Sequence, residues 1–473
     1  MKTFFPIATA LLLTTAAQAQ TVTELVSQGS SRTATAVTVY NDNLALVKEQ
    51  RKLSLPGGQV RLSLRDVSAQ MQPETALLSA VTGKPITLIE QNFDFDLLTP
   101  QKLLDKYVGR EVTVIRGNPV TGVETREKAT VLAASQAGYS NAVLRFADRI
   151  ETGVPGRLAF DSVPGTLRDR PTLSVLLDSA GGSQTLELSY LTAGLGWKAD
   201  YVANLNEGGK TLDLNGWVTL TNSSGAAYEN ATLQLVAGSL NRVQPERRNF
   251  RNEGKVMAMA ADAAAPREEA LMDYHLYTFD RPTTLAENQT KQLALLSAAG
   301  VAAEREYLLT GNDYYYMSRY DTIGEKLKPT VFVIFKNKGG QLGKPLPAGT
   351  VRVYARDSQG AAQFVGEDSI SHTAKNETVR LRLGEAFDIT ADRKQTNYKR
   401  INDHSNENSF SIVIRNAKSE AVTVKVQEPM PGDWEITQQN LKHVKESAHL
   451  AVWNVTVPAE GSATLEYTAR VKW

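Results

Sequence analysis

The sequence contains no cysteine among its 473 residues. A chain without cysteine forms no disulfide, offers no thiolate to a metal and has no thiol nucleophile. It also has no cysteine to which an N-terminal lipid anchor would be attached. Stability must therefore come from hydrophobic burial, and a chain of this length is long enough for three or four domains.

The sequence also has no excess of one charge. It carries 52 basic and 51 acidic residues, and removal of an N-terminal segment containing Lys2 leaves 51 of each. A chain with almost no net charge produces no overall field that attracts nucleic acid or an anionic membrane. We therefore expect no nucleic-acid partner.

Long apolar runs are missing after the N-terminus. A membrane-spanning helix needs about 18 consecutive apolar residues, and no later segment has them. The first residues instead have the pattern of a signal peptide: Lys2, the apolar segment 7–13, and Ala17-Gln18-Ala19 as a small-residue cleavage site. We expect a signal peptide at 1–19, cleavage after Ala19, a periplasmic or secreted protein, and no transmembrane helix after cleavage.

Most of the remaining chain alternates apolar and polar residues between turn signals, which predicts β-strands with one buried face. The predicted fold class is mainly β: tandem β-sandwich domains with a small inserted SH3-like barrel and few short helices. The first expected domain is an N-terminal β-domain at 20–95, which continues after 165 if the SH3-like barrel at 96–165 is an insertion. A first β-sandwich follows at 166–310, with a flexible loop at 243–272. The last domain is a C-terminal β-sandwich region at 311–473.

Three segments share one pattern. Residues 216–222, 331–337 and 410–416 each alternate, end at asparagine and lead into a short polar turn before another alternating segment. Asparagine tolerates left-handed backbone and caps turns, so we expect it to shape the turn itself. The pattern predicts sandwich hairpins or sheet-crossing pairs.

Gly194, Gly196 and Ala199 have the spacing of a dinucleotide-binding fingerprint. That fingerprint requires a following helix, whose N-terminus holds the pyrophosphate. Residues 200–205 alternate as a strand instead. No cofactor is therefore expected.

The segment 196–201, with Gly216-Trp217 and 222–225 downstream, resembles the bacterial proteins that carry domain of unknown function 4139. The segments 274–277, 285–296, and 343–349 followed by 351–354 fit the same resemblance. It covers about Leu173 to Trp473. The resemblance implies a fold and a compartment, but that family has no established activity and supplies no catalytic residues.

Residues 284–299 have helix-like composition, whereas the resemblance favours strands around 291–297. Both interpretations remain open from the sequence.

The best candidates for binding are aromatic or basic side chains just before the strand at Val331. On a strand, Tyr314 and Tyr316 would share one face with Tyr320. Tyrosine suits contacts with peptides and sugars, although packing of a linker strand between domains is the favoured explanation of the cluster. The candidate binding residues are Tyr314, Tyr316, Arg319, Tyr320 and Trp197.

Patterns typical of catalysis are scarce. None of the five histidines belongs to an H-E-x-x-H pair, and we expect no metal site. Asp388 and Asp392 would serve glycoside hydrolysis if they faced one cleft. The alternating C-terminal residues 465–473 end on an aromatic residue, as the terminal strands of outer-membrane barrels do.

The sequence therefore favours a secreted, non-enzymatic binding or scaffold protein of the bacterial cell envelope, with an envelope protein or a glycan as partner. One alternative is a carboxylate-dependent envelope polysaccharide hydrolase. A second alternative is an outer-membrane-associated β-protein.

Overall fold

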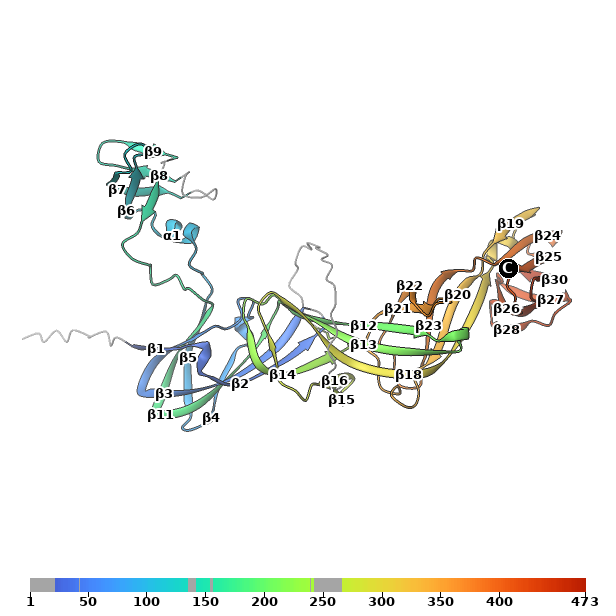
Figure 1. Cartoon of the computed structure of the whole chain (residues 1–473), viewed down its shortest axis with the longest axis horizontal. Coiled ribbons are helices and arrows are strands. Elements are labelled where there is room, and N and C mark those ends of the chain that lie inside the picture. The colour runs from blue at the N-terminus through green and yellow to red at the C-terminus, as the bar shows by residue number, and fades with distance from the viewer. Residues whose placement is uncertain (1–21, 42, 135–141, 154–155, 239, 242–265) are drawn as a thin grey trace, which may run out of the picture. The chain divides into compact units, whose positions relative to one another are not determined.

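The computed structural model describes residues 22–41, 43–134, 142–153, 156–238, 240–241 and 266–473 (Figure 1). The signal peptide predicted at 1–19 lies outside these residues. The described part of the chain is mainly β, as predicted, with several sheets and one short α-helix. It divides into two compact units. The first holds residues up to Val37, Leu46–Gly194 and Ser223–Ala231, and the second holds Thr38–Ala45, Leu195–Asn222 and Thr232–Trp473.

The first unit contains long strands of one sheet. They are β1 (Thr23–Ser27), β2 (Arg32–Tyr40), β3 (Leu44–Arg65), β4 (Leu77–Thr82), β5 (Ile86–Asp94) and β11 (Thr172–Thr192). β2, β3, β11 and β4 are neighbours in this order, β1 pairs with β3 in parallel, and β5 pairs with β11. Alternate residues such as Leu62, Leu64 and Leu177 are fully or almost fully buried, which explains the period of two in the sequence.

A smaller sheet in the first unit follows the only α-helix of the described residues. Its elements are α1 (Pro100–Lys106), β6 (Glu111–Gly117), β7 (Glu124–Ala133), β8 (Val143–Arg145), β9 (Ile150–Thr152) and β10 (Arg157–Ala159). Thr99 caps α1 by accepting a hydrogen bond from the Lys102 amide, as its sequence predicts. The strand order is β10-β6-β7-β8-β9, and no ladder joins β9 to β10 within the described residues. The SH3-like barrel therefore stays a prediction.

The second unit contains two larger groups of strands. The first group is β12 (Leu195–Leu205), β13 (Thr211–Asn222), β18 (Gln289–Thr310), β20 (Thr330–Lys336), β21 (Gly349–Arg356), β22 (Ala362–Ile370), β23 (Thr378–Glu385), β26 (Val422–Pro429), β28 (Val444–Ser447) and β29 (Leu450–Val457). The order β22-β21-β12-β13-β18-β26-β29-β28 runs across it, and β20 pairs with β18 and β23. β18 pairs with β13 up to Ala302 and with β20 from Ala303 onward.

The second group forms the other layer of the C-terminal part. It comprises β19 (Thr322–Leu327), β24 (Ile389–Asn402), β25 (Ser405–Asn416), β27 (Asp433–Gln439) and β30 (Gly461–Lys472), in the order β19-β24-β25-β30-β27. Phe410 and Leu465 of this layer share one buried core with Val426 and Trp453 of the first group. Two layers around one core confirm the sandwich character of this region.

The remaining strands lie wholly or partly in the second unit. They are β14 (Tyr228–Ala237), β15 (Arg267–Leu271), β16 (Tyr274–Thr278) and β17 (Thr283–Leu285). β16 pairs with β14 and with β15. The loop predicted at 243–272 thus contains a strand, β15, and residues 242–265 lie outside the described part of the chain.

Two open questions of local structure are settled. Residues 284–299 contain no helix: β17 ends at Leu285 and β18 begins at Gln289. The segment after Gly194 is the strand β12, which confirms that the glycine spacing there does not belong to a dinucleotide fold.

The three asparagines that end the repeated pattern bind backbone groups through buried side chains. Asn222, Asn337 and Asn416 are buried, and none has a left-handed φ. Each side-chain amide donates to two carbonyl oxygens: Asn222 to Leu285 and Ala286, Asn337 to Lys344 and Ala374, Asn416 to Glu420 and Pro458. The expectation of left-handed backbone at these asparagines was wrong. The expected turn cap is present at Asn416, whose side-chain oxygen accepts a hydrogen bond from the Lys418 amide two residues further on. The buried amides add the second role of binding two backbone segments.

Candidate functional site

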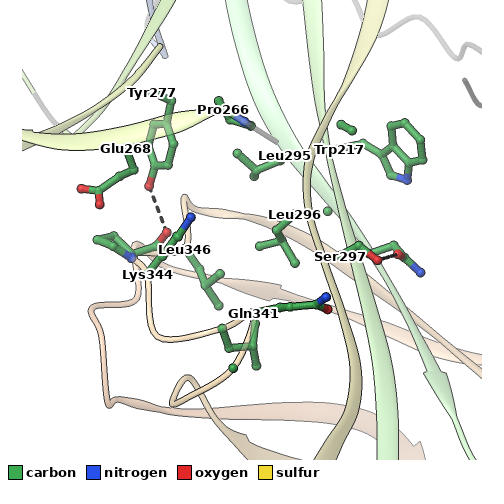
Figure 2. A pocket seen from close by; sticks show the side chains of 16 residues that line it. Trp217, Pro266, Glu268, Tyr277, Leu295, Leu296, Ser297, Gln341, Lys344 and Leu346 are labelled. Atoms are coloured by element: carbon green, nitrogen blue, oxygen red, sulfur yellow. Dashed lines mark hydrogen bonds between the residues drawn. The ribbon is translucent and has the colours of Figure 1, made fainter. Parts of the chain in front are cut away.

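A groove of about 520 Å³ lies within the second unit (Figure 2). One side comes from β18 and β13, a second from the β15–β16 hairpin, and a third from the loop between β20 and β21. Its lining is Asn215, Gly216, Trp217, Pro266, Glu268, Tyr277, Ala294, Leu295, Leu296, Ser297, Gly340, Gln341, Leu342, Lys344, Pro345 and Leu346. In Figure 2, Tyr277, Glu268 and Lys344 face Leu295 and Leu296 across the groove.

A β-bulge in β18 shapes the leucine wall. Gly216 pairs with Leu296 and Trp217 pairs with Ala294, so Leu295 is an extra residue without a partner in β13. A bulge of this kind redirects side chains, and both leucines point into the groove (Figure 2). Gly216 provides the space, because a Cβ there would lie 3.0 Å from the Leu296 Cγ and 3.1 Å from the Tyr201 ring.

Three buried side chains hold the opposite wall, the loop 338–347. The Asn337 amide donates to the Lys344 carbonyl at 2.7 Å, and its oxygen accepts from the Gly343 amide at 3.0 Å. The Tyr277 hydroxyl donates to the Pro345 carbonyl at 3.0 Å, and the Tyr201 hydroxyl donates to the Pro347 carbonyl at 2.8 Å. Burial raises the pKa of both tyrosines, so both remain neutral donors at physiological pH. The groove is thus formed before any ligand arrives.

The polar groups at the mouth are few. Glu268 contacts the Nδ1 of His275 at 2.8 Å. Lys344 and Gln341 are exposed, and their side chains have no hydrogen-bond or ion-pair partner among the described residues. The same described ranges contain no group of three or more histidine, aspartate or glutamate side chains that would hold a metal ion. The groove therefore combines an apolar wall with Glu268, Gln341 and Lys344 at its mouth, and Asn215 and Ser297 add a hydrogen-bonded polar pair to the lining.

The tyrosine segment is a 3-10 turn, Asp313–Tyr316, and not a strand. Tyr315 and Tyr316 are therefore both buried, and the face expected to carry Tyr314 with Tyr316 does not form. The Tyr316 hydroxyl contacts the Tyr467 hydroxyl at 2.9 Å and donates to Glu428 at 3.3 Å. Glu428 in turn forms a fully buried ion pair with Arg393 at 2.6 Å. Tyr316 thus belongs to the core and is not available to a ligand.

The other members of this cluster remain at the surface. Tyr314 and Arg319 are exposed, and Tyr320 is half-buried. The rings of Tyr314 and Tyr320 lie edge-to-face with centroids 6.0 Å apart. Gln395 fixes the segment by accepting from the Tyr320 amide and donating to the Ser318 carbonyl. These residues form a small aromatic surface at the base of a rigid turn.

Trp197, the remaining candidate, is 5% exposed. Its indole nitrogen donates to the Val236 carbonyl at 3.3 Å, and its ring packs edge-to-face against Tyr277 at 6.5 Å. Trp197 therefore packs against Tyr277, which lines the groove, but Trp197 does not line the groove itself.

One of the two carboxylates considered for hydrolysis, Asp392, has structural partners. Asp392 accepts from the Lys326 amide at 2.9 Å and from Arg415 at 2.6 Å. These contacts lower its pKa, the backbone hydrogen bond most. A carboxyl held as an anion by two donors is a poor general acid.

Comparison with known families agrees with the resemblance seen in the sequence. The family model described as Domain of unknown function (DUF4139) matches residues 186–473. The chain belongs to this family. No curated protein matches it.

The DUF4139 region contains the whole groove. The segments that carry the resemblance in the sequence, around Trp217, Tyr277, Leu296 and Lys344, meet there. Each segment is recognisable in the sequence, but their contact is not, because it depends on strand order. The pairs Gly216–Leu296 and Tyr277–Pro345 are 80 and 68 residues apart, and only the folded sheet brings each pair into contact.

Within the described residues, no helix is long and apolar enough to span a bilayer.

Proposed function

We propose that this DUF4139 protein is a secreted, non-enzymatic binding or scaffold protein of the bacterial cell envelope, and that its second unit binds a partner at the groove. The observation that carries the proposal is the preformed groove, whose loop wall is held by Asn337, Tyr277 and Tyr201. A site that needs no rearrangement loses less conformational entropy on binding.

The lining favours an envelope protein over a glycan as partner. Leu295, Leu296, Leu342 and Leu346 offer an apolar surface suited to an aliphatic or aromatic side chain of another protein. Sugar sites are typically built from flat aromatic faces with many free hydrogen-bond donors and acceptors. The groove has two aromatic lining residues, Trp217 and Tyr277, but the Tyr277 hydroxyl bonds to Pro345 and Asn215 bonds to Ser297. Gln341, Lys344 and Glu268 would orient the partner at the mouth.

The aromatic surface of Tyr314 and Tyr320 supports a second candidate, a glycan contact. Exposed tyrosine rings offer apolar faces on which a sugar ring can stack. This candidate rests on the edge-to-face ring pair and on its rigid attachment through Gln395.

The test is site-specific photo-crosslinking of the mature protein in the intact envelope. A photoreactive residue replaces Gln341 at the mouth of the groove, and the matched control carries it at the exposed Gln363 of β22. We expect a product from position 341 that is absent from position 363. The groove-filling substitution Leu296→Trp should abolish this product, whereas Tyr314→Ala should leave it unchanged.

Thermal unfolding of Leu296→Trp must show a folded protein for the comparison to count. A product from position 341 that survives in folded Leu296→Trp would contradict binding in the groove. Loss of the product in Tyr314→Ala alone would move the contact to the aromatic surface. Recovery of the protein from the cytoplasmic fraction would contradict the envelope assignment.

A further inference from the structure

The first unit has one sheet edge that combines unpaired backbone with exposed apolar side chains. β4 pairs with residues 185–189 of β11, and β5 pairs with residues 172–179 of the same strand. The two strands are therefore successive segments of one edge, separated only by Gly83, Lys84 and Pro85. Within the described residues, β11 is the only strand that pairs with either segment.

β4 and β5 each contain a β-bulge that leaves one apolar residue without a partner in β11. Thr82 pairs with Thr185 and Ala80 with Leu186, so Val81 has no partner in β11. Leu88 pairs with Leu177 and Glu90 with Leu176, so Ile89 has none either. Val81 is 48% and Ile89 is 49% exposed. Two β-branched apolar residues, which suit strands, thus stand half-exposed on an open edge.

Further apolar side chains extend this edge. Leu77 and Leu88 are exposed, and beyond the end of β5 Phe95 is exposed and stacks on Phe93 at 5.7 Å. Proteins normally protect a free edge with lysine, proline, a bulge or a covering segment. Here Lys84 and Pro85 lie in the break between the strands, and each strand has a bulge at one position, at Val81 and at Ile89. The rest of β4 and β5 has no lysine, proline or covering strand within the described residues.

The edge carries one charge without an opposite charge nearby. Glu90, in the middle of β5, is exposed, and its carboxylate contacts only the amide of Asn92, at 2.5 Å. No cation pairs with it in the described part of the chain. A lysine or arginine on an added strand would complement it, because opposite charges across a strand pair stabilise the pairing.

We propose that the β4–β5 edge accepts an extended, apolar segment of another polypeptide as an added strand, with a basic residue of that segment facing Glu90. Only another strand supplies donors and acceptors at the spacing that unpaired strand backbone requires. A second copy of this chain is a poorer occupant. Antiparallel pairing of two β5 strands about Ile89 would bring two uncompensated Glu90 carboxylates close together.

The test uses synthetic peptides and the full mature chain. The probe is a labelled nine-residue peptide of alternating valine and threonine with one central lysine. The first control is the same peptide with alternate backbone nitrogens methylated, which removes donors and keeps the side chains. The second control has glutamate in place of lysine. Binding is measured by fluorescence anisotropy.

We expect the lysine peptide to bind. The methylated and glutamate peptides should bind at least about tenfold more weakly, which corresponds to a loss of about 1.4 kcal/mol in binding free energy. Glu90→Lys should reverse the preference between the lysine and glutamate peptides. Ile89→Lys should weaken binding, whereas Val163→Lys, a change at another exposed apolar residue, should not.

Three results would overturn the proposal: no binding up to about 1 mM peptide, equal binding of the methylated peptide, or an unchanged preference in Glu90→Lys. The reversal in Glu90→Lys requires a folded variant, so a misfolded variant cannot imitate it. Leu296→Trp should leave peptide binding unchanged, which separates this edge from the groove. A concentration-dependent dimer abolished by Ile89→Lys would assign the edge to a second copy and overturn the proposed partner.

Discussion

The side-chain amide of Asn337 lies 2.7 Å from the carbonyl oxygen of Lys344, seven residues further along the chain. The same amide also donates to Ala374, which precedes β23. One buried residue thus ties the end of β20 to the groove wall and to a second loop.

Replacement of this residue should be costly. Asn337→Ala would leave two carbonyls and the Gly343 amide without their partner, and we expect a loss of about 2–4 kcal/mol in the free energy of unfolding. Urea denaturation measures the effect. The exposed Asn397 is the control, and Asn397→Ala should change stability by less than about 0.5 kcal/mol. Equal effects of both substitutions would contradict the role given to Asn337.

Tyr314 and Tyr316 should differ in how much they contribute to stability. Tyr316→Phe removes a hydroxyl that contacts Tyr467 and Glu428, and should destabilise the protein by about 1–3 kcal/mol. Tyr314→Ala, at an exposed ring, should cost less than about 1 kcal/mol. Thermal unfolding of the two variants distinguishes these outcomes. A larger loss in Tyr314→Ala than in Tyr316→Phe would contradict the buried position of Tyr316.

A single methyl group at position 216 should alter the groove. In Gly216→Ala the new Cβ would press on Leu296 and Tyr201, so the leucine wall must shift. We expect crosslinking from position 341 to fall at least about tenfold while the protein stays folded. A loss of about 1.4 kcal/mol in the binding free energy of the partner is enough to weaken binding tenfold. Gly117→Ala is the control, since its Cβ would meet no atom within 4 Å. Unchanged crosslinking in Gly216→Ala would show that the leucine wall does not contact the partner.

Asp392 should make stability depend on pH in acid. In the folded state, the Lys326 amide and Arg415 lower the pKa of Asp392 below its ordinary value of 3.8. Between the folded-state pKa and the ordinary pKa, the unfolded chain therefore binds more protons than the folded protein. The stabilisation is complete above the ordinary pKa and is lost as the pH falls through the folded-state value. The side chain is only partly buried, so the gain stays below about 1 kcal/mol.

The measurement compares Asp392→Asn with the parent by urea denaturation at about pH 6 and about pH 2.5. The stability difference should shrink at the lower pH. Asp433→Asn, at an exposed residue without an ion pair in the described part of the chain, should show no such change. A difference that grows in acid would mean that burial, not the two donors, dominates at Asp392.

The sequence predicted local structure well where short-range signals are strong. The alternation of β12 excluded a nucleotide fold. Threonine followed by proline is a common helix start, and Thr99 and Pro100 stand at the start of α1. The sequence could not predict that Tyr316 turns inward, because the partners Glu428 and Tyr467 lie more than 100 residues away. It also missed the groove, since its walls depend on strand order and on the extra residue at Leu295. Composition over residues 284–299 suggested a helix that pairing with β13 prevents.

The exchange of partners along β18 has a mechanical consequence. Ala302 is the last residue paired with β13, and Ala303 is the first paired with β20, so one unbroken backbone serves two ladders. A force along this strand would have to shear both ladders before either could separate. A protease cut between Ala302 and Ala303 would therefore disconnect the two ladders, although each strand would keep its own partner.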